Sequence, residues 1–243
     1  MTAAGRALDG QVAIVTGAGR GLGRAIAEAL AREGAAVVLA ARSRQQLAEA
    51  AAAIKSGGGR ALAIPTDVTQ DAAVAALVEQ TVGEFGRLDV LVTAAGTASF
   101  GPVAGTKPAD WDAMLAVNLR AVMVCCCAVL PVMLQQRRGT IVNIASVAAQ
   151  RFIPGAAAYA ATKAGVVAWS RVLREEVRAE GVRVGVLVPG AVDTPLWDTI
   201  PGGPDRTRML RPEDVARAVV LMVSMPPGAT LEELTLLPAG GIL

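Results

Sequence analysis

Short apolar runs and longer amphipathic stretches alternate along the whole chain. The runs are rich in Val, Ile, Leu and Ala without strict polar alternation, which is typical of strands buried on both faces of a parallel sheet. They predict strands at 12–15, 36–40, 61–64, 90–93, 140–144 and 183–188, and another near 234–237. The stretches between them predict helices at 23–33, 44–56, 71–85, 111–138, 157–180 and 212–225. We therefore expect a single α/β domain over residues 1–243, with a Rossmann-like doubly wound parallel sheet of about seven strands and helices on both faces.

A glycine-rich turn separates the first predicted strand from the first predicted helix. It reads Thr16-Gly17-Ala18-Gly19-Arg20-Gly21-Leu22-Gly23. Where side chains are absent, backbone N–H groups can approach a phosphate, and the helix N-terminus adds partial positive charge. No Gly-Lys-[Ser/Thr] follows, so the turn is not a P-loop. Between a strand and a helix, it favours a dinucleotide-binding site.

The only tyrosine, Tyr159, lies four residues before Lys163 in a predicted helix. Residues four apart share a helix face, so we expect the ammonium group beside the phenol. A nearby positive charge favours the phenolate, which would make Tyr159 a proton donor and acceptor near neutral pH. The hydroxyl of Ser146 is a candidate to hold a substrate oxygen. Such a pair also occurs by chance in helices, and the glycine-rich turn is what favours the catalytic interpretation.

Composition narrows the possible functions. The chain has no histidine and a net charge of +2, which excludes Ser-His-Asp and Cys-His catalysis and argues against a metal site or nucleic-acid binding. The three cysteines are consecutive, at 125–127, without metal-ligand spacing, and are expected to be small buried hydrophobes.

The termini and the apolar runs predict a location. The apolar run at 121–134 contains Pro131 and is too short to span a bilayer, so it is expected to be a buried or subunit-facing helix and no membrane partner is expected. Arg6 and Asp9 interrupt the only candidate for a signal peptide, and we expect a cytoplasmic protein.

Several motifs in one order resemble those of the short-chain dehydrogenase/reductase family. They are the glycine-rich turn, Asn118, Ser146, Tyr159, Lys163 and Pro189-Gly190, and the similarity runs from about residue 8 to the carboxyl end. The resemblance implies that NADPH delivers hydride to a carbonyl carbon while Tyr159 protonates the oxygen. It further implies that Lys163 holds the nicotinamide ribose and lowers the pKa of Tyr159, that Ser146 bonds the substrate oxygen, and that Asn118 supports a water chain.

The nicotinamide cofactor is expected to be NADP(H). Ala41 fills the position at the end of the second strand where an acidic residue would bind the free ribose of NAD, and Arg42 follows it. Arg42 and Arg20 suit a 2′-phosphate, unless both are ordinary surface arginines. The resemblance implies a cofactor site made of Gly17, Arg20, Gly21, Leu22, Gly23, Arg42, Asp67, Val68, Ala95, Gly96, Lys163, Pro189, Gly190, Val192 and Thr194.

Two positions leave alternatives open. Asp67 either flanks the adenine together with Val68 or caps the next helix. Thr93-Ala94 stands where the family usually has two asparagines, which puts contacts around the adenosine and the central sheet in question.

The predicted substrate contacts lie in two segments that follow Ser146 and Pro189-Gly190. The segment 194–211 is rich in Gly and Pro and predicts a mobile lid. Leu196 and Trp197 in the lid, and Gln150 and Phe152 after Ser146, are the predicted substrate contacts, although Trp197 alternatively anchors the loop.

The carboxyl end at 226–238 resembles family members that act on 3-hydroxy acids, serine-like substrates or small aldehydes. We therefore expect a small-molecule ketone, aldehyde or 3-oxo acid as substrate. A 3-oxoacyl-carrier-protein reductase and a catalytically silent NADP(H)-binding sensor or scaffold are the alternatives. The resemblance also implies a homotetramer or homodimer.

Overall fold

The computed structural model describes residues 6–200 and 203–242, and its strands form one sheet. In the order β3-β2-β1-β4-β5-β6-β7, every neighbouring pair is parallel. The strands are β1 (Val12–Thr16), β2 (Ala36–Ala41), β3 (Arg60–Pro65), β4 (Val90–Thr93), β5 (Gly139–Ile144), β6 (Val182–Pro189) and β7 (Glu233–Leu236). This confirms the predicted doubly wound parallel sheet.

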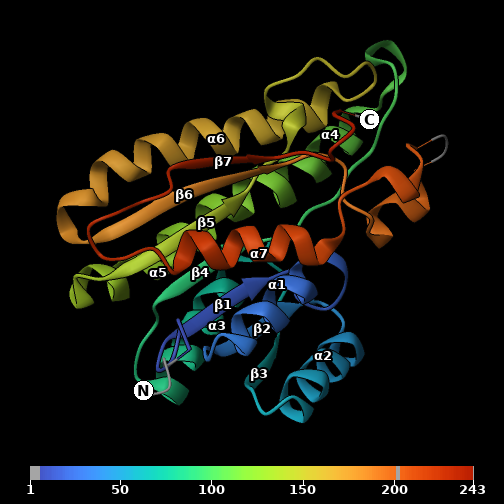
Figure 1. The fold of residues 1–243 in the computed structure, drawn as a ribbon. Helices are drawn as coiled ribbons and strands as arrows, with labels where there is room; N and C mark the ends of the chain where they lie inside the picture. Colours follow the sequence, from blue (N-terminus) through green and yellow to red (C-terminus); the bar gives the residue numbers. More distant parts are fainter. Residues whose placement is uncertain (1–5, 201–202, 243) are drawn as a thin grey trace.

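Helices cover both faces of the sheet (Figure 1). One layer contains α1 (Gly21–Arg32), α2 (Arg44–Ser56) and α7 (Pro212–Val223). The other contains α3 (Asp71–Phe85), α5 (Ala121–Gln136) and α6 (Ala157–Val177). Although far apart in the sequence, α1 and α7 lie side by side on the near face (Figure 1).

Strand β1 shows why the apolar runs lack polar alternation. Ala13 and Val15 pack into one core, whereas Val12 and Ile14 pack into the core on the opposite face. Successive side chains of a strand point to opposite faces, so a strand covered on both sides is apolar throughout. Burying a side chain such as Ile14 stabilises the fold by about 1.5–3 kcal/mol.

The predicted helix at 111–138 begins three residues earlier and ends two residues earlier than expected, and it is less regular. It consists of α4 (Pro108–Leu115), a π-helical turn (Ala116–Arg120) and α5, which run on without a break. This helix has 29 residues and contains an 18-residue stretch with a mean hydropathy of 2.2, so by length and composition it could cross a membrane. The apolar run at 121–134, which by itself is too short to span a bilayer, is only part of it. Its residues Cys125, Cys126 and Val129 pack into the core beside the sheet.

The cysteines do not all behave as expected. Cys125 and Cys126 are buried, and burial raises the pKa of each thiol to about 12. Cys127 is exposed, because consecutive helical positions point in different directions.

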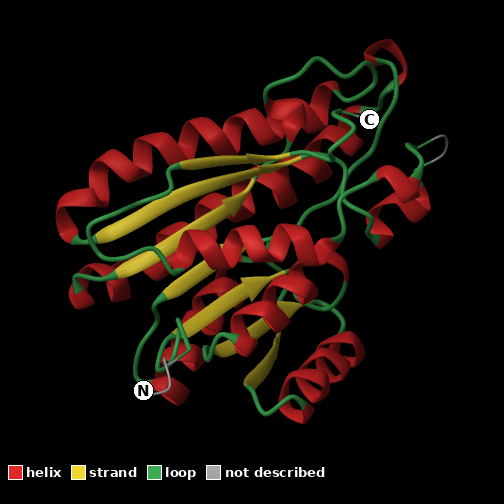
Figure 2. Ribbon diagram, viewed as in Figure 1, coloured by secondary structure: helices red, strands yellow, loops and turns green. Residues whose placement is uncertain are grey.

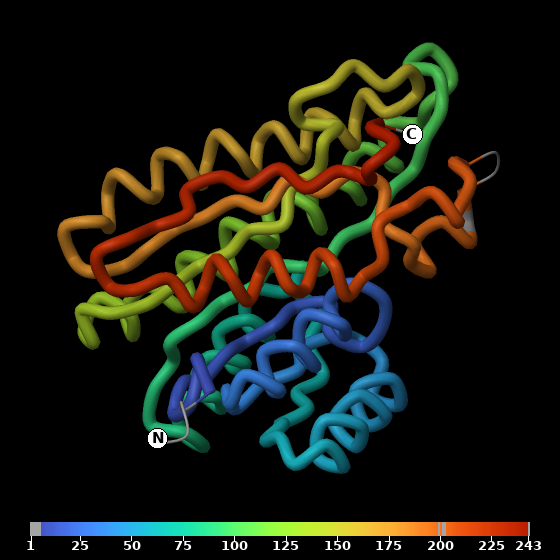
Figure 3. Tube along the Cα trace, viewed as in Figure 1, coloured from blue at the N-terminus to red at the C-terminus, as the bar shows by residue number. Residues whose placement is uncertain are grey.

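The carboxyl edge of the sheet is where segments from distant parts of the chain meet. All arrowheads point to this edge (Figure 2), and the strand order reverses between β1 and β4. Ligands of open α/β sheets bind outside the carboxyl ends of the strands at such a reversal. The segment from β6 to α7 also leaves the sheet here (Figure 3) and contains the short turns η5 (Pro195–Thr199) and η6 (Arg206–Arg208). Residues 201 and 202 of the predicted lid lie outside the described residues.

Candidate active site

The glycine-rich turn has no room for larger side chains. Gly17 has φ +69°, and a Cβ there would lie 2.8 Å from the Cα of Ala95. A Cβ on Gly23 would lie 2.3 Å from the main-chain oxygen of Gly17. Among the described residues, no side chain caps α1 at its N-cap residue Arg20, and its first turn carries no acidic residue. The turn therefore presents free main-chain N–H groups and partial positive charge, which suits a phosphate.

The predicted ribose and adenine contacts follow β1, β2 and β3. Arg20 and Arg42 are both exposed, and the charge of Arg42 acts on Asp67. The main-chain N–H and the hydroxyl of Thr69 donate to the Asp67 carboxylate at 3.0 and 2.7 Å. These bonds hold the pKa of Asp67 below its usual value, and Arg42 adds a smaller effect. The carboxylate thus fixes the turn after β3, while Val68 is buried.

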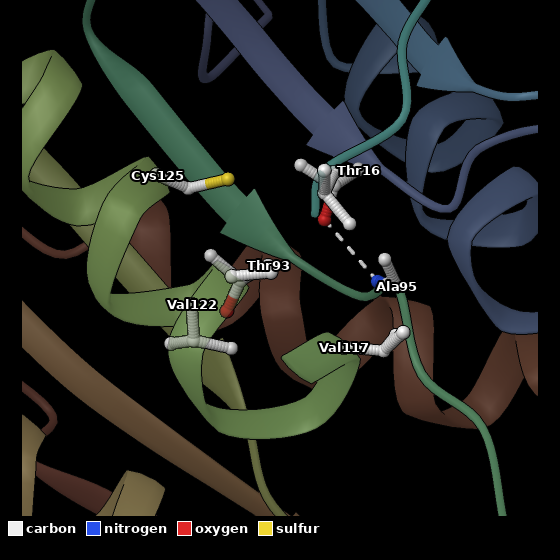
Figure 4. Close-up of a pocket in the computed structure, with 8 residues that line it drawn as sticks. Thr16, Thr93, Ala95, Val117, Val122 and Cys125 are labelled. Carbon is white, nitrogen blue, oxygen red and sulfur yellow. Dashed lines mark hydrogen bonds between the residues drawn. The ribbon is translucent and has the colours of Figure 1, made fainter. Parts of the chain in front are cut away.

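A narrow crevice lies at the reversal point, between the ends of β1 and β4 on one side and the start of α5 on the other (Figure 4). Thr16, Val68, Thr93 and Ala95 are among its lining residues. The main-chain N–H of Ala95 donates a 3.2 Å hydrogen bond to the hydroxyl oxygen of Thr16 (Figure 4). This bond ties the loop after β4 to the end of β1.

The departure at Thr93 is compensated by a buried polar chain. The Thr93 hydroxyl donates to Oδ1 of Asn143 at 2.8 Å, and the Asn143 amide donates to the hydroxyl of Ser170 at 2.9 Å. Ser170 donates in turn to the main-chain oxygen of Val166 at 2.7 Å. Thr93, Asn143 and Ser170 are at most 3% exposed. The central strands therefore remain linked to α6 without an asparagine at position 93.

Asn118 is fully buried in the π-helical turn and clamps the loop after β4. Its Oδ1 accepts from the N–H of Thr97 at 2.8 Å, and its Nδ2 donates to the oxygen of the same residue at 2.8 Å. Nδ2 also lies 3.3 Å from the Thr162 hydroxyl on α6. The side chain is thus fully engaged with protein groups.

Tyr159, Lys163 and Ser146 meet where β5 ends and α6 begins. Lys163 Nζ lies 5.8 Å from the centre of the Tyr159 ring and donates a 2.9 Å hydrogen bond to the main-chain oxygen of Ile144. Ser146 follows β5, and its hydroxyl accepts from the N–H of Ala148 at 3.2 Å. The structure therefore brings the predicted catalytic side chains together.

Burial sets the direction in which the pKa of Tyr159 is shifted. Burial raises the pKa of the Tyr159 phenol, and an interaction with the Ser146 hydroxyl opposes that effect in part. Burial also lowers the pKa of Lys163 to about 8. The ammonium group is directed at the carbonyl of Ile144, and burial is the largest effect on the pKa of the phenol.

The segment after β6 folds against the glycine-rich turn. Gly190 donates to the main-chain oxygen of Leu236 at 2.8 Å, and Val192 forms a bridge with Leu210. A Cβ on Gly21 would lie 3.3 Å from Cβ of Thr194. Thr194 is thus placed beside the start of α1, although it lies 173 positions after Gly21 in the sequence.

The predicted substrate residues do not all gather near Tyr159. Trp197 Nε1 donates to the main-chain oxygen of Val192 at 2.9 Å, so this ring anchors its own loop. The ring also stacks on Phe100, which in turn contacts Tyr159. Leu196 is partly buried next to Trp197. Gln150 is exposed and its amide donates to Glu233 on β7, while Phe152 is fully exposed.

A separate hollow of about 290 Å³ lies between the segment 99–106, α4 and α6. Its walls are mostly apolar and include Trp111, Met114 and Ala158.

Comparison with known proteins agrees with this geometry. The family model for short chain dehydrogenases matches residues 11–203. The chain belongs to the short-chain dehydrogenase/reductase family. An uncharacterized oxidoreductase of Staphylococcus aureus is 35% identical over 231 residues, which cover 95% of this chain and 98% of the relative. One from Staphylococcus saprophyticus is 37% identical over 232 residues, with the same coverage of 95% and 98%.

Solved structures also resemble this short-chain dehydrogenase/reductase closely. A metagenomic short-chain oxidoreductase in complex with NADP is 36% identical with a TM-score of 0.85, covering 96% of this chain and 99% of the other. An alcohol dehydrogenase from the archaeon Thermococcus sibiricus, complexed with 5-hydroxy-NADP, is 33% identical with a TM-score of 0.87, covering 94% and 97%.

Sequence reasoning missed three side chains at the site of this short-chain dehydrogenase/reductase. Asn143 is a polar residue inside an apolar strand run, and that position was an available signal. Ser170 and Phe100 gave no local signal, since their roles depend on contacts with distant segments.

Proposed function

We propose that this protein is an NADP(H)-dependent oxidoreductase that interconverts a ketone, aldehyde or 3-oxo acid and the corresponding alcohol. The main support is the buried ammonium group of Lys163 next to Tyr159, at the same sheet edge as the glycine-rich turn. A buried cation beside a phenol is an arrangement that suits proton transfer.

The glycine-rich turn fits a dinucleotide cofactor. Close backbone approach at Gly17 and Gly23 and the uncapped start of α1 suit a pyrophosphate. Arg20 and Arg42 are exposed cations that would pair with a 2′-phosphate, and two similar solved structures hold NADP or its 5-hydroxy analogue. The remaining contacts of the cofactor would come from the site predicted by the resemblance. When bound, the nicotinamide supplies or accepts the hydride.

Ser146, after β5, and Tyr159 and Lys163, on α6, would carry out the proton transfer. The raised pKa of Tyr159 keeps its phenol protonated at neutral pH, so that it can donate to the oxygen of a carbonyl substrate. Ser146 would donate a hydrogen bond to the same oxygen and stabilise the charge that develops there. Lys163, with a pKa of about 8, would offset the charge on the phenolate and return a proton to it. The side chain of Asn118 already bonds Thr97, so its main chain would support the water chain.

Two further features belong to the proposal. Buried reduced cysteines support a reducing cytoplasmic location. Exposed apolar side chains on α4 and α6, such as Leu115 and Val172, support a homotetramer or homodimer, which light scattering of the purified protein would test. The segment 194–211 would act as a lid, and the chain as one domain.

The test is a substrate panel followed by NADPH absorbance, with NADH in parallel. Small aldehydes, ketones, 3-oxo acids and 3-oxoacyl thioesters would be compared. Consumption of NADPH with one of these classes, and poor consumption of NADH, is the expected result. Preference for the thioesters would favour the acyl-carrier-protein reductase alternative. Measurable NADPH binding without turnover of any compound would contradict the proposal that the protein is an oxidoreductase. It would favour the catalytically silent sensor or scaffold.

A further inference from the structure

Three aromatic rings from three distant segments lie against one another at the catalytic end of the sheet. Phe100 belongs to the loop after β4, Tyr159 to α6, and Trp197 to η5. The rings of Phe100 and Trp197 are parallel, with an interplanar angle of 2° and centres 5.9 Å apart. Phe100 is tilted by 54° against Tyr159, at 5.7 Å. Phe100 thus joins the lid segment to the catalytic phenol.

The orientation of the Trp197 ring is fixed by its surroundings. Its Nε1 donates to the main-chain oxygen of Val192, which leaves the ring faces for apolar contacts. Gly203 lies so close that a Cβ there would come within 3.0 Å of Cε3 of the ring. The ring is therefore held in one orientation, and with Phe100 stacked on it the two rings form an aromatic wall.

Arg206, a cation of the same segment as Trp197, is already paired. Arg206 donates to the carboxylates of Asp193 and Asp198 and to the main-chain oxygen of Thr194. The amide of Gln150, the other predicted polar contact, is bonded to Glu233. A substrate carboxylate placed against Phe100 and Trp197 would lose hydration without gaining one of these groups as a partner.

We propose that Phe100 and Trp197 form an apolar subsite, and that the substrate is an uncharged carbonyl compound with a flat apolar substituent, such as an aryl ketone. This inference rests on the proposed function. Because Phe100 contacts the Tyr159 ring, a carbonyl oxygen bonded to the phenol brings its substituent to the wall. The wall also disfavours the 3-oxo and 3-hydroxy acids that the carboxyl-terminal resemblance indicated.

Three compounds test the substrate class: acetophenone, 3-oxobutanoate and its uncharged ethyl ester. With NADPH, kcat/KM for acetophenone should exceed that for 3-oxobutanoate by roughly a hundredfold, and the ester should lie between them. Phe100→Leu should lower kcat/KM for acetophenone by about fivefold and for the ester by less than about twofold, since only the aromatic contact is lost. Phe85→Leu, which removes a core-packed ring from the end of α3, is the matched control. It should leave kcat/KM for acetophenone and kcat/KM for the ester unchanged.

A binding measurement gives a readout that is independent of turnover. Benzamide, an unreactive aryl carbonyl compound, should change the tryptophan fluorescence of the wild-type protein, and Trp197→Phe should lose most of that change. Phe100→Leu should weaken benzamide binding by about fivefold.

The outcomes separate the subsite from the proposed function. Reduction of 3-oxobutanoate in preference to acetophenone would overturn the subsite and leave the oxidoreductase intact. The same holds if Phe100→Leu leaves both benzamide binding and acetophenone reduction unchanged. If no compound is reduced while benzamide binding still depends on Phe100, the subsite stands and the proposed reaction fails.

Discussion

Lys163 donates its 2.9 Å hydrogen bond to the main-chain oxygen of Ile144, at the end of β5. Lys163 is 5% exposed, and burial lowers its pKa to about 8. Burying the charged Lys163 therefore destabilises the native state at neutral pH. In the proposed reaction the same buried charge supports proton transfer.

The stability contributed by Lys163 should depend on pH. The native group releases its proton near pH 8, whereas the unfolded group keeps it until about pH 10.4. Between these values the unfolded chain binds more protons, so this group makes the native state more stable as pH rises, by up to roughly 3 kcal/mol. Cys125 and Cys126 have raised pKa values and act in the opposite direction above about pH 8.5.

A comparison of variants isolates this effect. Urea unfolding of the wild type and of Lys163→Met should be measured at about pH 7 and about pH 9.5, below the range in which Tyr159 ionises. The wild type should gain stability relative to the variant as pH rises, because the cysteines are common to both. If the difference in the free energy of unfolding between wild type and variant is the same at both pH values, the pKa of Lys163 is not lowered in the native state.

Tyr159→Phe should abolish turnover and spare cofactor binding. The variant keeps the ring that packs on Phe100 and loses only the hydroxyl. We expect kcat to fall by about 10³-fold, within the range for loss of a general acid. The dissociation constant of NADPH, measured by fluorescence titration, should change by less than about twofold. Substantial residual activity would remove Tyr159 from the mechanism.

Arg42→Ala should weaken NADPH binding and leave NADH binding unchanged. Loss of a charge-assisted contact to the 2′-phosphate corresponds to about a tenfold or greater rise in the dissociation constant of NADPH. Arg44→Ala is the matched control, since Arg44 is an exposed arginine at the start of α2. Equal effects of the two variants would mean that only general surface charge matters.

Thr93→Val should destabilise the fold through the buried polar chain. Valine keeps the shape and leaves Oδ1 of Asn143 without the 2.8 Å bond from Thr93. We expect the free energy of unfolding to fall by about 1–3 kcal/mol. Thr235→Val on the exposed side of β7 should change it by less than about 0.5 kcal/mol. Similar values for the two variants would contradict a structural role of the Thr93 hydroxyl.

Most of the fold was predictable because it follows from local patterns. The structure has α2 at 44–56, α3 at 71–85 and β4 at 90–93, with the same bounds as the apolar periodicity predicted. The glycine-rich turn was readable for the same reason, since contiguous residues create it. The π-helical turn at Asn118 was missed because the sequence continues as an unbroken helical pattern through it.

The sequence by itself determined the sheet, the glycine-rich turn and the spacing of Tyr159 and Lys163, because each depends on neighbours along the chain. Only the tertiary structure decided that Lys163 is directed at Ile144, that burial raises the pKa of Tyr159, and that Phe100 stacks on Trp197. These properties depend on desolvation and on contacts between segments that parallel crossovers bring to one edge of the sheet.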